Sequence, residues 1–394
     1  MLFKDLKKAL GANVRDYGMF IALFVIMAFF TITTKGLFIS SQNISNLLNQ
    51  TGYIAVLAVG MTLVIVVRHI DLSVGFLAGF LGAVGAIGLS AWHLPAFVVI
   101  PMVLALGVLA GLATAFLVAK LGIPSFVASL AGWLIYRGAL LLVTRKAGTI
   151  IIDNPTFNAI GNGYIPDIFP EFMLFEGMHK LTLLLGMVAV VWFVLKSLRD
   201  RKNKQAYGFD VLPTGVFVIK LVFISLILLA IVWNLAGYNG LSWTMVIVLA
   251  VVFIYDFVTR HTVLGRHIYA VGGNPEAAEL SGISVKKIVF TVFASMGMLS
   301  ALSGILFSSY LASASPQAGT LFELDAIAAA YIGGVSAAGG VGKVTGSLIG
   351  AIVYMTLTSG MNLMGTDMAL QYVVRGAVLA LAVIFDVQTR KVRR

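Results

Sequence analysis

The sequence predicts an all-α integral membrane protein, a polytopic helical bundle of about twelve transmembrane helices with both termini in the cytoplasm. Hydrophobic residues make up 60% of its 394 residues and charged residues only 11%, and the mean hydropathy is +1.00. So few charged side chains cannot cover a water-facing surface. A soluble enzyme, a disordered chain and a nucleic-acid-binding module are therefore excluded.

The elements follow from the apolar runs. A helix needs roughly 20 mostly apolar residues to cross about 30 Å of hydrocarbon, where lipid offers its backbone no hydrogen-bond partners. Twelve segments fit this pattern, and we expect them to form a single transmembrane domain over residues 1–394. They are 17–33, 51–67, 73–92, 96–119, 125–143, 181–195, 215–236, 243–258, 288–310, 324–338, 344–363 and 372–387.

The positions of lysine and arginine set the orientation, because cytoplasmic loops carry an excess of both. With both termini inside, twenty of the 27 basic side chains face the cytoplasm. Only Lys35, Arg145, Lys146 and Lys180 face outward. The net charge of +11 therefore indicates membrane topology and not nucleic-acid binding.

Segment 324–338 is shorter than a comfortable span. It begins beside Glu323 and Asp325 and runs into the glycine-rich stretch 339–342, so it either crosses the membrane or re-enters it. We favour a crossing, because without it the basic cluster at 390–394 would lie outside.

Pairs of glycines four residues apart mark thin faces on three predicted helices, which let helix backbones approach closely in lipid. These pairs are Gly75 and Gly79, Gly107 and Gly111, and Gly346 and Gly350. Plain helix packing and the lining of a pathway are both compatible with this pattern.

Catalytic motifs are missing from the sequence. The stretch 339–343 resembles a phosphate-binding loop only superficially, since Ala337 stands where the motif needs glycine and Val344 where it needs Ser or Thr. The chain has no cysteine, and we expect no cofactor and no metal. A non-catalytic membrane subunit that moves a solute is the interpretation that remains.

The longest cytoplasmic loop, residues 260–287, contains a short helix with strong boundary signals. Asn274 is a good N-cap, Pro275 suits the first helical position, Glu276 favours the positive helix start, and Gly282 suits the residue after the end. Two turns of helix are marginal alone in water. We therefore expect the helix to pack either on its own bundle or on a partner.

Four stretches of sequence, in order, resemble permeases of the ribose, xylose and galactose branch of bacterial ABC sugar importers. They are 70–75 (IDLSVG), 123–126 (IPSF) with 136–138 (YRG), the loop from Gly265 to Ile283, and the block from Leu324 to Gly342. The resemblance covers most of the chain. Two spans within about 165–240 look like an insertion relative to the ribose type, which favours the xylose or multiple-sugar permeases.

The resemblance implies a multi-pass protein of the bacterial inner membrane that works with a cytoplasmic ABC ATPase and a periplasmic sugar-binding protein. A second copy of the chain would complete the pathway for a monosaccharide, with selectivity largely left to the binding protein. It also implies that the helix 275–281 docks in the ATPase. The coupling residues would be Gly272, Asn274, Pro275, Glu276, Ala277, Ala278, Ser281 and Gly282. The outer segments 144–180 and 312–323 are the expected contacts of the binding protein.

Candidate pathway or gate residues lie in the other motifs. They are Asp71, Ser73, Pro124, Ser125, Arg137 and Asp325. A charge at membrane depth is costly unless it is paired or hydrated. For Asp71, pairing with Arg68 or capping the next helix at Ser73 are the structural alternatives.

Two rival functions fit twelve spans. A proton-coupled secondary transporter would need an acidic residue deep in a helix, whereas most carboxylates here lie near predicted span ends. A passive channel or scaffold would need no ATPase partner.

Overall fold

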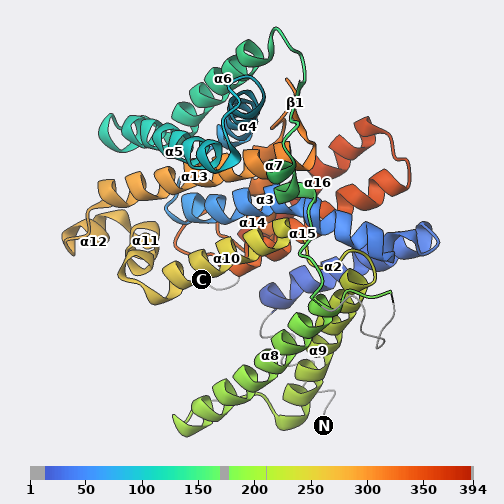
Figure 1. The fold of residues 1–394 in the computed structure, drawn as a ribbon. Coiled ribbons are helices and arrows are strands. Elements are labelled where there is room, and N and C mark those ends of the chain that lie inside the picture. Colours follow the sequence, from blue (N-terminus) through green and yellow to red (C-terminus); the bar gives the residue numbers. More distant parts are fainter. Residues whose placement is uncertain (1–13, 169–176, 210, 392–394) are drawn as a thin grey trace.

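A computed structural model describes residues 14–168, 177–209 and 211–391, and this part of the chain is almost entirely helical (Figure 1). Both termini, which we expected in the cytoplasm, lie outside the described residues. The helices are α2 (Val14–Thr33), η1 (Leu37–Ile39), α3 (Ser41–Val66), α4 (Val74–Ser90), α5 (Ala96–Ala115), η2 (Phe116–Lys120), α6 (Ser125–Thr144), α7 (Pro155–Asn162), α8 (Lys180–Ala206), α9 (Thr214–Ala236), α10 (Trp243–His261), α11 (Val263–Gly273), α12 (Pro275–Leu280), α13 (Val285–Tyr310), α14 (Phe322–Ile332), α15 (Val344–Leu363) and α16 (Met368–Lys391). Two short strands, β1 (Ile150–Ile151) and β2 (Ser313–Ala314), complete the fold.

Each of the twelve predicted segments contains a helix. Within the described residues, nine helices are long and apolar enough to cross a membrane, namely α3, α5 with η2, α6, α8, α9, α10, α13, α15 and α16. The apolar part of α2 and the whole of α4 are shorter. The prediction of an all-α polytopic membrane bundle is confirmed.

The core is formed by α3 and α13, which cross the bundle side by side and antiparallel (Figure 1). Near one end, the Gln50 amide donates to the Tyr310 hydroxyl at 3.0 Å. Further along, the Ser303 hydroxyl donates to the Tyr53 carbonyl at 2.9 Å. The end of the bundle that carries α11 and α12 is called the inner side here, and the opposite end the outer side.

Segment 324–338, which we favoured as a crossing, is helical only as far as Ile332. Its helix, α14, has 11 residues, which span only about 16 Å. The chain nevertheless passes from the outer end of α13 to the inner end of α15. The non-helical stretches before and after α14 cover the distance that this short helix does not. Its inner loop is fixed at the inner side, where the Gly340 amide donates to the Val66 carbonyl at 2.9 Å.

Helices α3 to α6 and α13 to α16 follow the same plan in opposite directions. Each set opens with a 26-residue helix, α3 or α13. A connection that folds back into the bundle follows, residues 67–73 in one set and 311–321 in the other. A short second helix, α4 or α14, then starts inside the bundle. Inverted repeats with discontinuous helices are common in transporters, where the broken helices meet near the membrane midplane.

Helices α8 and α9 form an antiparallel hairpin that projects from the bundle (Figure 1). Their apolar windows have high mean hydropathy, 2.2 and 2.9, and are almost entirely unburied. At the outer side the chain enters and leaves the hairpin at one place, because the Ile165 amide donates to the Leu241 carbonyl at 2.9 Å. The hairpin is therefore attached to the bundle mainly at its outer end, with a further contact between Phe223 of α9 and Phe24 of α2, whose ring centres are 5.8 Å apart.

The two outer segments pair with each other. Strand β1 runs antiparallel to β2, with Ile150 opposite Ala314. Helix α7 covers the end of α13, where the Asn162 amide donates to the carbonyls of Ser309 and Tyr310 at 2.9 and 2.8 Å. No pattern in the sequence indicated this small structured surface.

Candidate functional site

The short helix in the inner loop forms as predicted, one residue shorter than expected. The Asn274 side chain accepts a hydrogen bond from the Ala277 amide at 3.1 Å. Pro275 occupies the first turn, and Gly282 has the left-handed φ of +83° that suits the residue after a helix. These three features fix both ends of α12.

Helix α12 projects from the protein. Within it only Ala278 is buried, at 4% exposure. Leu280 is 90% exposed, and Glu276, Ala277 and Glu279 are also exposed. One face is thus anchored, while an apolar tip and two carboxylates face outward.

Helix α11, directly before α12, was not predicted, because we treated residues 260–273 as loop. Thr262 caps it by accepting from the Gly265 amide at 3.2 Å. Its Tyr269 hydroxyl donates to the Gly342 carbonyl at 2.6 Å, and burial raises the pKa of this phenol. The Thr262 cap was the available signal, and it was obscured by the scattered glycines and histidines that follow it.

The end of α11 is tied to the end of α3. Arg68 donates from Nε to the Gly272 carbonyl at 2.7 Å and from its guanidinium to the Gly273 carbonyl. Gly272 packs so closely on the Val66 carbonyl and Gly340 that a Cβ atom would not fit. The end of α11 is therefore in direct contact with the end of α3 and with the loop after α14. The alternative that Arg68 pairs with Asp71 is wrong.

Asp71 caps the start of α4. Its Oδ1 accepts from the Ser73 amide at 2.9 Å and from the Ser73 hydroxyl at 2.6 Å. The Ser125 hydroxyl, just after Pro124 at the start of α6, accepts from the Ile70 amide at 3.3 Å. Three of the candidate gate residues, Asp71, Ser73 and Ser125, thus hold the connection 67–73 in place, while Pro124 only precedes the first residue of α6.

Glu323, which we had not selected, lies where the two short helices meet. It is 4% exposed, and its Oε1 accepts from Trp133 Nε1 of α6 at 3.0 Å. Its Oε2 is buried without a hydrogen-bond partner and lies against Gly75, in the first turn of α4. Trp133 is near the middle of α6, which places this carboxylate deep in the bundle. The sequence signal was a second acid beside Asp325.

Arg137 lies one turn after Trp133 on α6. Its guanidinium stacks on Phe76 of α4 at 4.8 Å from the ring centre and donates to the Pro316 carbonyl at 2.5 Å. Pro316 belongs to the connection that precedes α14. Trp133 therefore joins α6 to Glu323, and Arg137 joins α6 to the connection before α14.

Asp325 lies apart from the other candidates. Its Oδ1 accepts from the Tyr354 hydroxyl of α15 at 2.5 Å, and Arg375 of α16 stacks on the same tyrosine at 5.9 Å. Arg375 Nε is buried without a hydrogen-bond partner. The expectation that carboxylates lie near span ends is misleading, since Asp71, Glu323 and Asp325 stand at helix starts that are buried in the bundle.

Left-handed residues other than glycine occur in both connections. Arg68 has a φ of +66° in the first, and Ala312 and Leu321 have values of +48° and +65° in the second. Such conformations are costly for side chains with a Cβ and concentrate at functional and switch regions. Both broken regions thus combine left-handed backbone with buried charge, although Lys35 and His93 elsewhere in the chain are also left-handed.

Comparison with known proteins identifies the family. Residues 43–383 match the family model described as "Branched-chain amino acid transport system / permease component". The xylose transport system permease protein XylH of Haemophilus influenzae is 39% identical over 384 residues, covering 98% of this chain and 99% of that protein. XylH of Escherichia coli K12 is 38% identical, covering 96% and 93%. The ribose import permease protein RbsC of Haemophilus influenzae is 34% identical, covering 96% and 94%. No solved structure matches the chain.

These matches confirm the resemblance that the four motifs indicated, and the two xylose permeases match at higher identity than the ribose permease. They count against the proton-coupled secondary transporter and against a passive channel. The broken helices, the projecting α12 and the membrane-spanning bundle agree with this result. The chain therefore belongs to the permease component family of ABC transport systems, whose members are non-catalytic subunits of the inner membrane.

Proposed function

We propose that this chain forms the translocation pathway of an ATP-driven monosaccharide importer, with xylose as the first candidate substrate. The single observation that supports this most is the similarity to XylH along nearly the whole of both chains. A separate ABC ATPase hydrolyses ATP, and a periplasmic binding protein delivers the sugar. Two copies of the chain enclose the pathway.

Helix α12 is the element that the ATPase binds. Its exposed surface, Leu280 with Glu276 and Glu279, can enter a cleft of a partner, while buried Ala278 holds it to the bundle. Movement of α12 then passes through Gly272 and Arg68 to the end of α3. The residues from Gly272 to Gly282 thus transmit movement of the ATPase to the bundle.

The junction of α4 and α14 is the gate in this proposal. Asp71 and Ser73 form one edge, and Glu323 the other. Glu323 and the Arg137 contact at Pro316 hold the junction closed. The first contact joins α6 to the first turn of α14, and the second joins α6 to the connection before α14, so both must change if α6 separates from these elements. Asp325 with Tyr354 and Arg375 holds the other face of α14.

The paired outer segments are the proposed contact of the binding protein. Strands β1 and β2 and helix α7 join segments 144–180 and 312–323 into one surface at the outer side. The second of these segments leads directly into the gate. Docking at this surface could thereby reach the α4–α14 junction.

Reconstitution with the cognate ABC ATPase and binding protein tests this function. Wild-type proteoliposomes should take up xylose only with ATP and binding protein present, and uptake should persist when the proton gradient is dissipated. Leu280→Asp should weaken ATPase co-purification roughly 30-fold, the equivalent of about 2 kcal/mol for an interface anchor. Glu276→Lys should uncouple ATP hydrolysis from uptake.

The matched control is Leu121→Asp, which places the same charge at an exposed leucine of the inner side outside α11 and α12. Its co-purification with the ATPase should be unchanged. Proton-driven uptake without an ATPase, or equal loss of co-purification in both variants, contradicts the proposal.

A further inference from the structure

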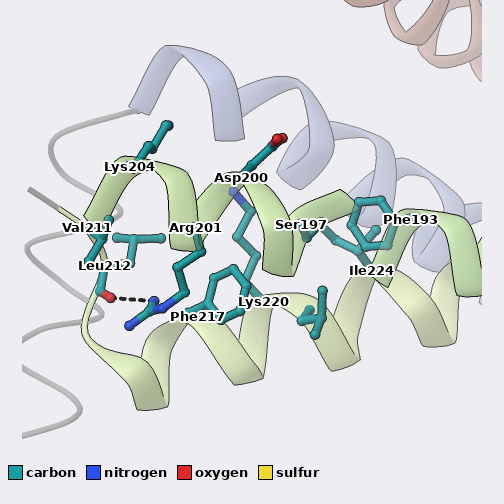
Figure 2. A pocket seen from close by; sticks show the side chains of 11 residues that line it. Phe193, Ser197, Asp200, Arg201, Lys204, Val211, Leu212, Phe217, Lys220 and Ile224 are labelled. Atoms are coloured by element: carbon teal, nitrogen blue, oxygen red, sulfur yellow. Dashed lines mark hydrogen bonds between the residues drawn. The ribbon is translucent and has the colours of Figure 1, made fainter. Parts of the chain in front are cut away.

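The hairpin of α8 and α9 contains a cavity near its inner turn. Its volume is about 410 Å³, and it lies between the two helices just before the turn that joins them (Figure 2). It is lined by Phe193, Ser197, Asp200, Arg201, Lys204, Val211, Leu212, Phe217, Lys220, Leu221 and Ile224. The sugar pathway proposed above involves none of these residues.

The cavity is apolar at one end and basic at the other. Phe193 and Ile224 line the end that continues into the apolar part of the hairpin, while Arg201 and Lys204 lie toward the turn (Figure 2). Leu221, three residues before Ile224 on α9, also lines the cavity. The apolar run of α8 ends just before Lys196, where charged residues begin. The cavity therefore spans the level at which hydrocarbon gives way to lipid headgroups.

Arg201 is held in position for an anion. It donates to the Leu212 carbonyl at 2.7 Å and to the Thr214 hydroxyl at 3.1 Å, and it stacks on Phe217 at 4.6 Å from the ring centre. Arginine has five N–H donors in a rigid fork, so these two bonds orient the group and leave donors for a phosphate. Lys204 is exposed at the same end.

The charge around the cavity favours an anionic ligand. Residues 196–220 include six basic side chains, Lys196, Arg199, Arg201, Lys202, Lys204 and Lys220, and two acidic ones, Asp200 and Asp210, giving 6 − 2 = +4. Asp200 lines the cavity and opposes an anion locally, but three basic residues also line it. Basic pockets between transmembrane helices are typical sites for anionic headgroups.

The surroundings indicate that the ligand is a lipid. Nearly all of α8 and α9 is unburied and strongly apolar, so acyl chains are the medium around the cavity. Trp192, Tyr207 and Phe209 are 61%, 81% and 66% exposed near this end, as aromatic side chains are at membrane interfaces. Lys196 lies over the Trp192 ring at 4.8 Å.

We propose that this cavity binds one anionic phospholipid of the inner-side leaflet, with its phosphate at Arg201 and Lys204 and an acyl chain along Phe193, Leu221 and Ile224. The bound lipid fixes the inner end of a hairpin that is attached to the bundle mainly at its outer end. This binding is independent of the transport function proposed above.

Lipid retention by the full-length chain tests the site. The purified chain is exchanged from detergent into mixed micelles of dioleoyl phosphatidylglycerol or dioleoyl phosphatidylcholine, and bound lipid is counted by native mass spectrometry. Wild type should retain one phosphatidylglycerol in preference to phosphatidylcholine. Lys204→Gln should weaken this retention about five-fold, the effect of one cation at a membrane surface.

Two further variants distinguish lipid binding in the cavity from a general attraction of anionic lipid to the basic residues of α8. Lys202→Gln removes the same charge from the same helix, but Lys202 does not line the cavity, so retention should be unchanged. Leu221→Trp keeps every charge and fills the apolar end, so retention should be lost. Equal retention of both lipids, or equal loss in Lys204→Gln and Lys202→Gln, overturns the proposal.

Soluble anions distinguish a lipid from a free phosphate. Inorganic phosphate and glycerol 3-phosphate, added at millimolar concentration, should not displace bound phosphatidylglycerol, because they lack the acyl chain. Displacement by either anion would identify the site as one for a soluble phosphate and overturn the lipid assignment.

Discussion

Gly75 lies where the first turn of α4 meets Glu323 and the chain before α14. A Cβ atom at this position would lie 2.6 Å from the Gly319 carbonyl oxygen and would also collide with Glu323 Oε2. Because a backbone atom blocks the methyl group, Gly75→Ala should destabilise the protein by about 1–3 kcal/mol. The thermal unfolding midpoint of the purified chain in detergent should fall accordingly.

A glycine in the neighbouring helix provides the control for this substitution. A Cβ atom at Gly138 of α6 meets nothing within 4 Å, so Gly138→Ala should keep or raise the unfolding midpoint, since alanine favours a helix by roughly 0.5–1 kcal/mol over glycine. If the two variants shift the midpoint equally, the close contact of α4 with the chain before α14 is absent in the protein.

At the scale of residues, the contacts of a side chain could be predicted where its hydrogen-bond partner is close in sequence. The cap of α4 by Asp71 involves a residue two positions away, and such contacts follow from local spacing. Glu323 was missed because its partner Trp133 is 190 residues away in sequence. Only the folded bundle brings these two side chains together.

At the scale of elements, the bond between Arg68 and the end of α11 allows two proposed roles of this region to be tested separately. One role is binding of the ATPase, and the other is coupling of ATP hydrolysis to movement of the bundle. Arg68→Met keeps the aliphatic stem but removes both donors to the carbonyls of Gly272 and Gly273. The exposed surface of α12 is untouched, so the ATPase should still co-purify. Sugar-stimulated ATP hydrolysis in proteoliposomes should fall about ten-fold, as expected for the loss of a charged hydrogen bond.

Lys120→Met is the control for this experiment, because it removes an exposed cation from the inner side without a contact to α11. Its sugar-stimulated ATP hydrolysis should match that of wild type. Loss of ATPase binding in Arg68→Met would show that Arg68 shapes the docking surface itself, contrary to the transmission role.

The bounds of a helix could be predicted where residues with known preferences for helix ends, such as N-cap residues, proline and glycine, stand at those ends. The ends of α12 follow from Asn274, Pro275 and Gly282. The ends of α14 do not, because its start at Phe322 follows the left-handed Leu321, which no local preference favours. That conformation depends on the packing of the whole bundle. The helix also ends at Ile332, before the end of the predicted segment 324–338.

At the scale of the whole molecule, hydropathy predicted where the apolar helices lie along the chain but not their depth in the bundle. The starts of α4 and α14 are buried within the bundle, because α4 packs on α6 and α13 and α14 packs on α15 and α3. The idea that two spans within about 165–240 are an insertion stays a prediction. It gains support from the position of α8 and α9, which project from the bundle (Figure 1).

Excision of the hairpin tests this arrangement. Tyr164 forms a bridge with Ser242, and the Ile165 amide bonds the Leu241 carbonyl, so a turn of two or three glycines can replace residues 167–239. Removing a pair of spans preserves the orientation of all later helices. The shortened chain should therefore insert, elute as a single species in size-exclusion chromatography and retain the ATPase.

Deleting a different pair of helices, α5 and α6 at 96–144, provides the contrast. Gly107 and Gly111 of α5 pack directly on the backbone of α13 at Gly297 and Phe293, and close backbone contacts of this kind hold helices together in lipid. This deletion should yield only aggregated protein, although it too removes two spans. Aggregation of the hairpin-deleted chain as well would mean that α8 and α9 belong to the folded core, and the hairpin would then not be an insertion.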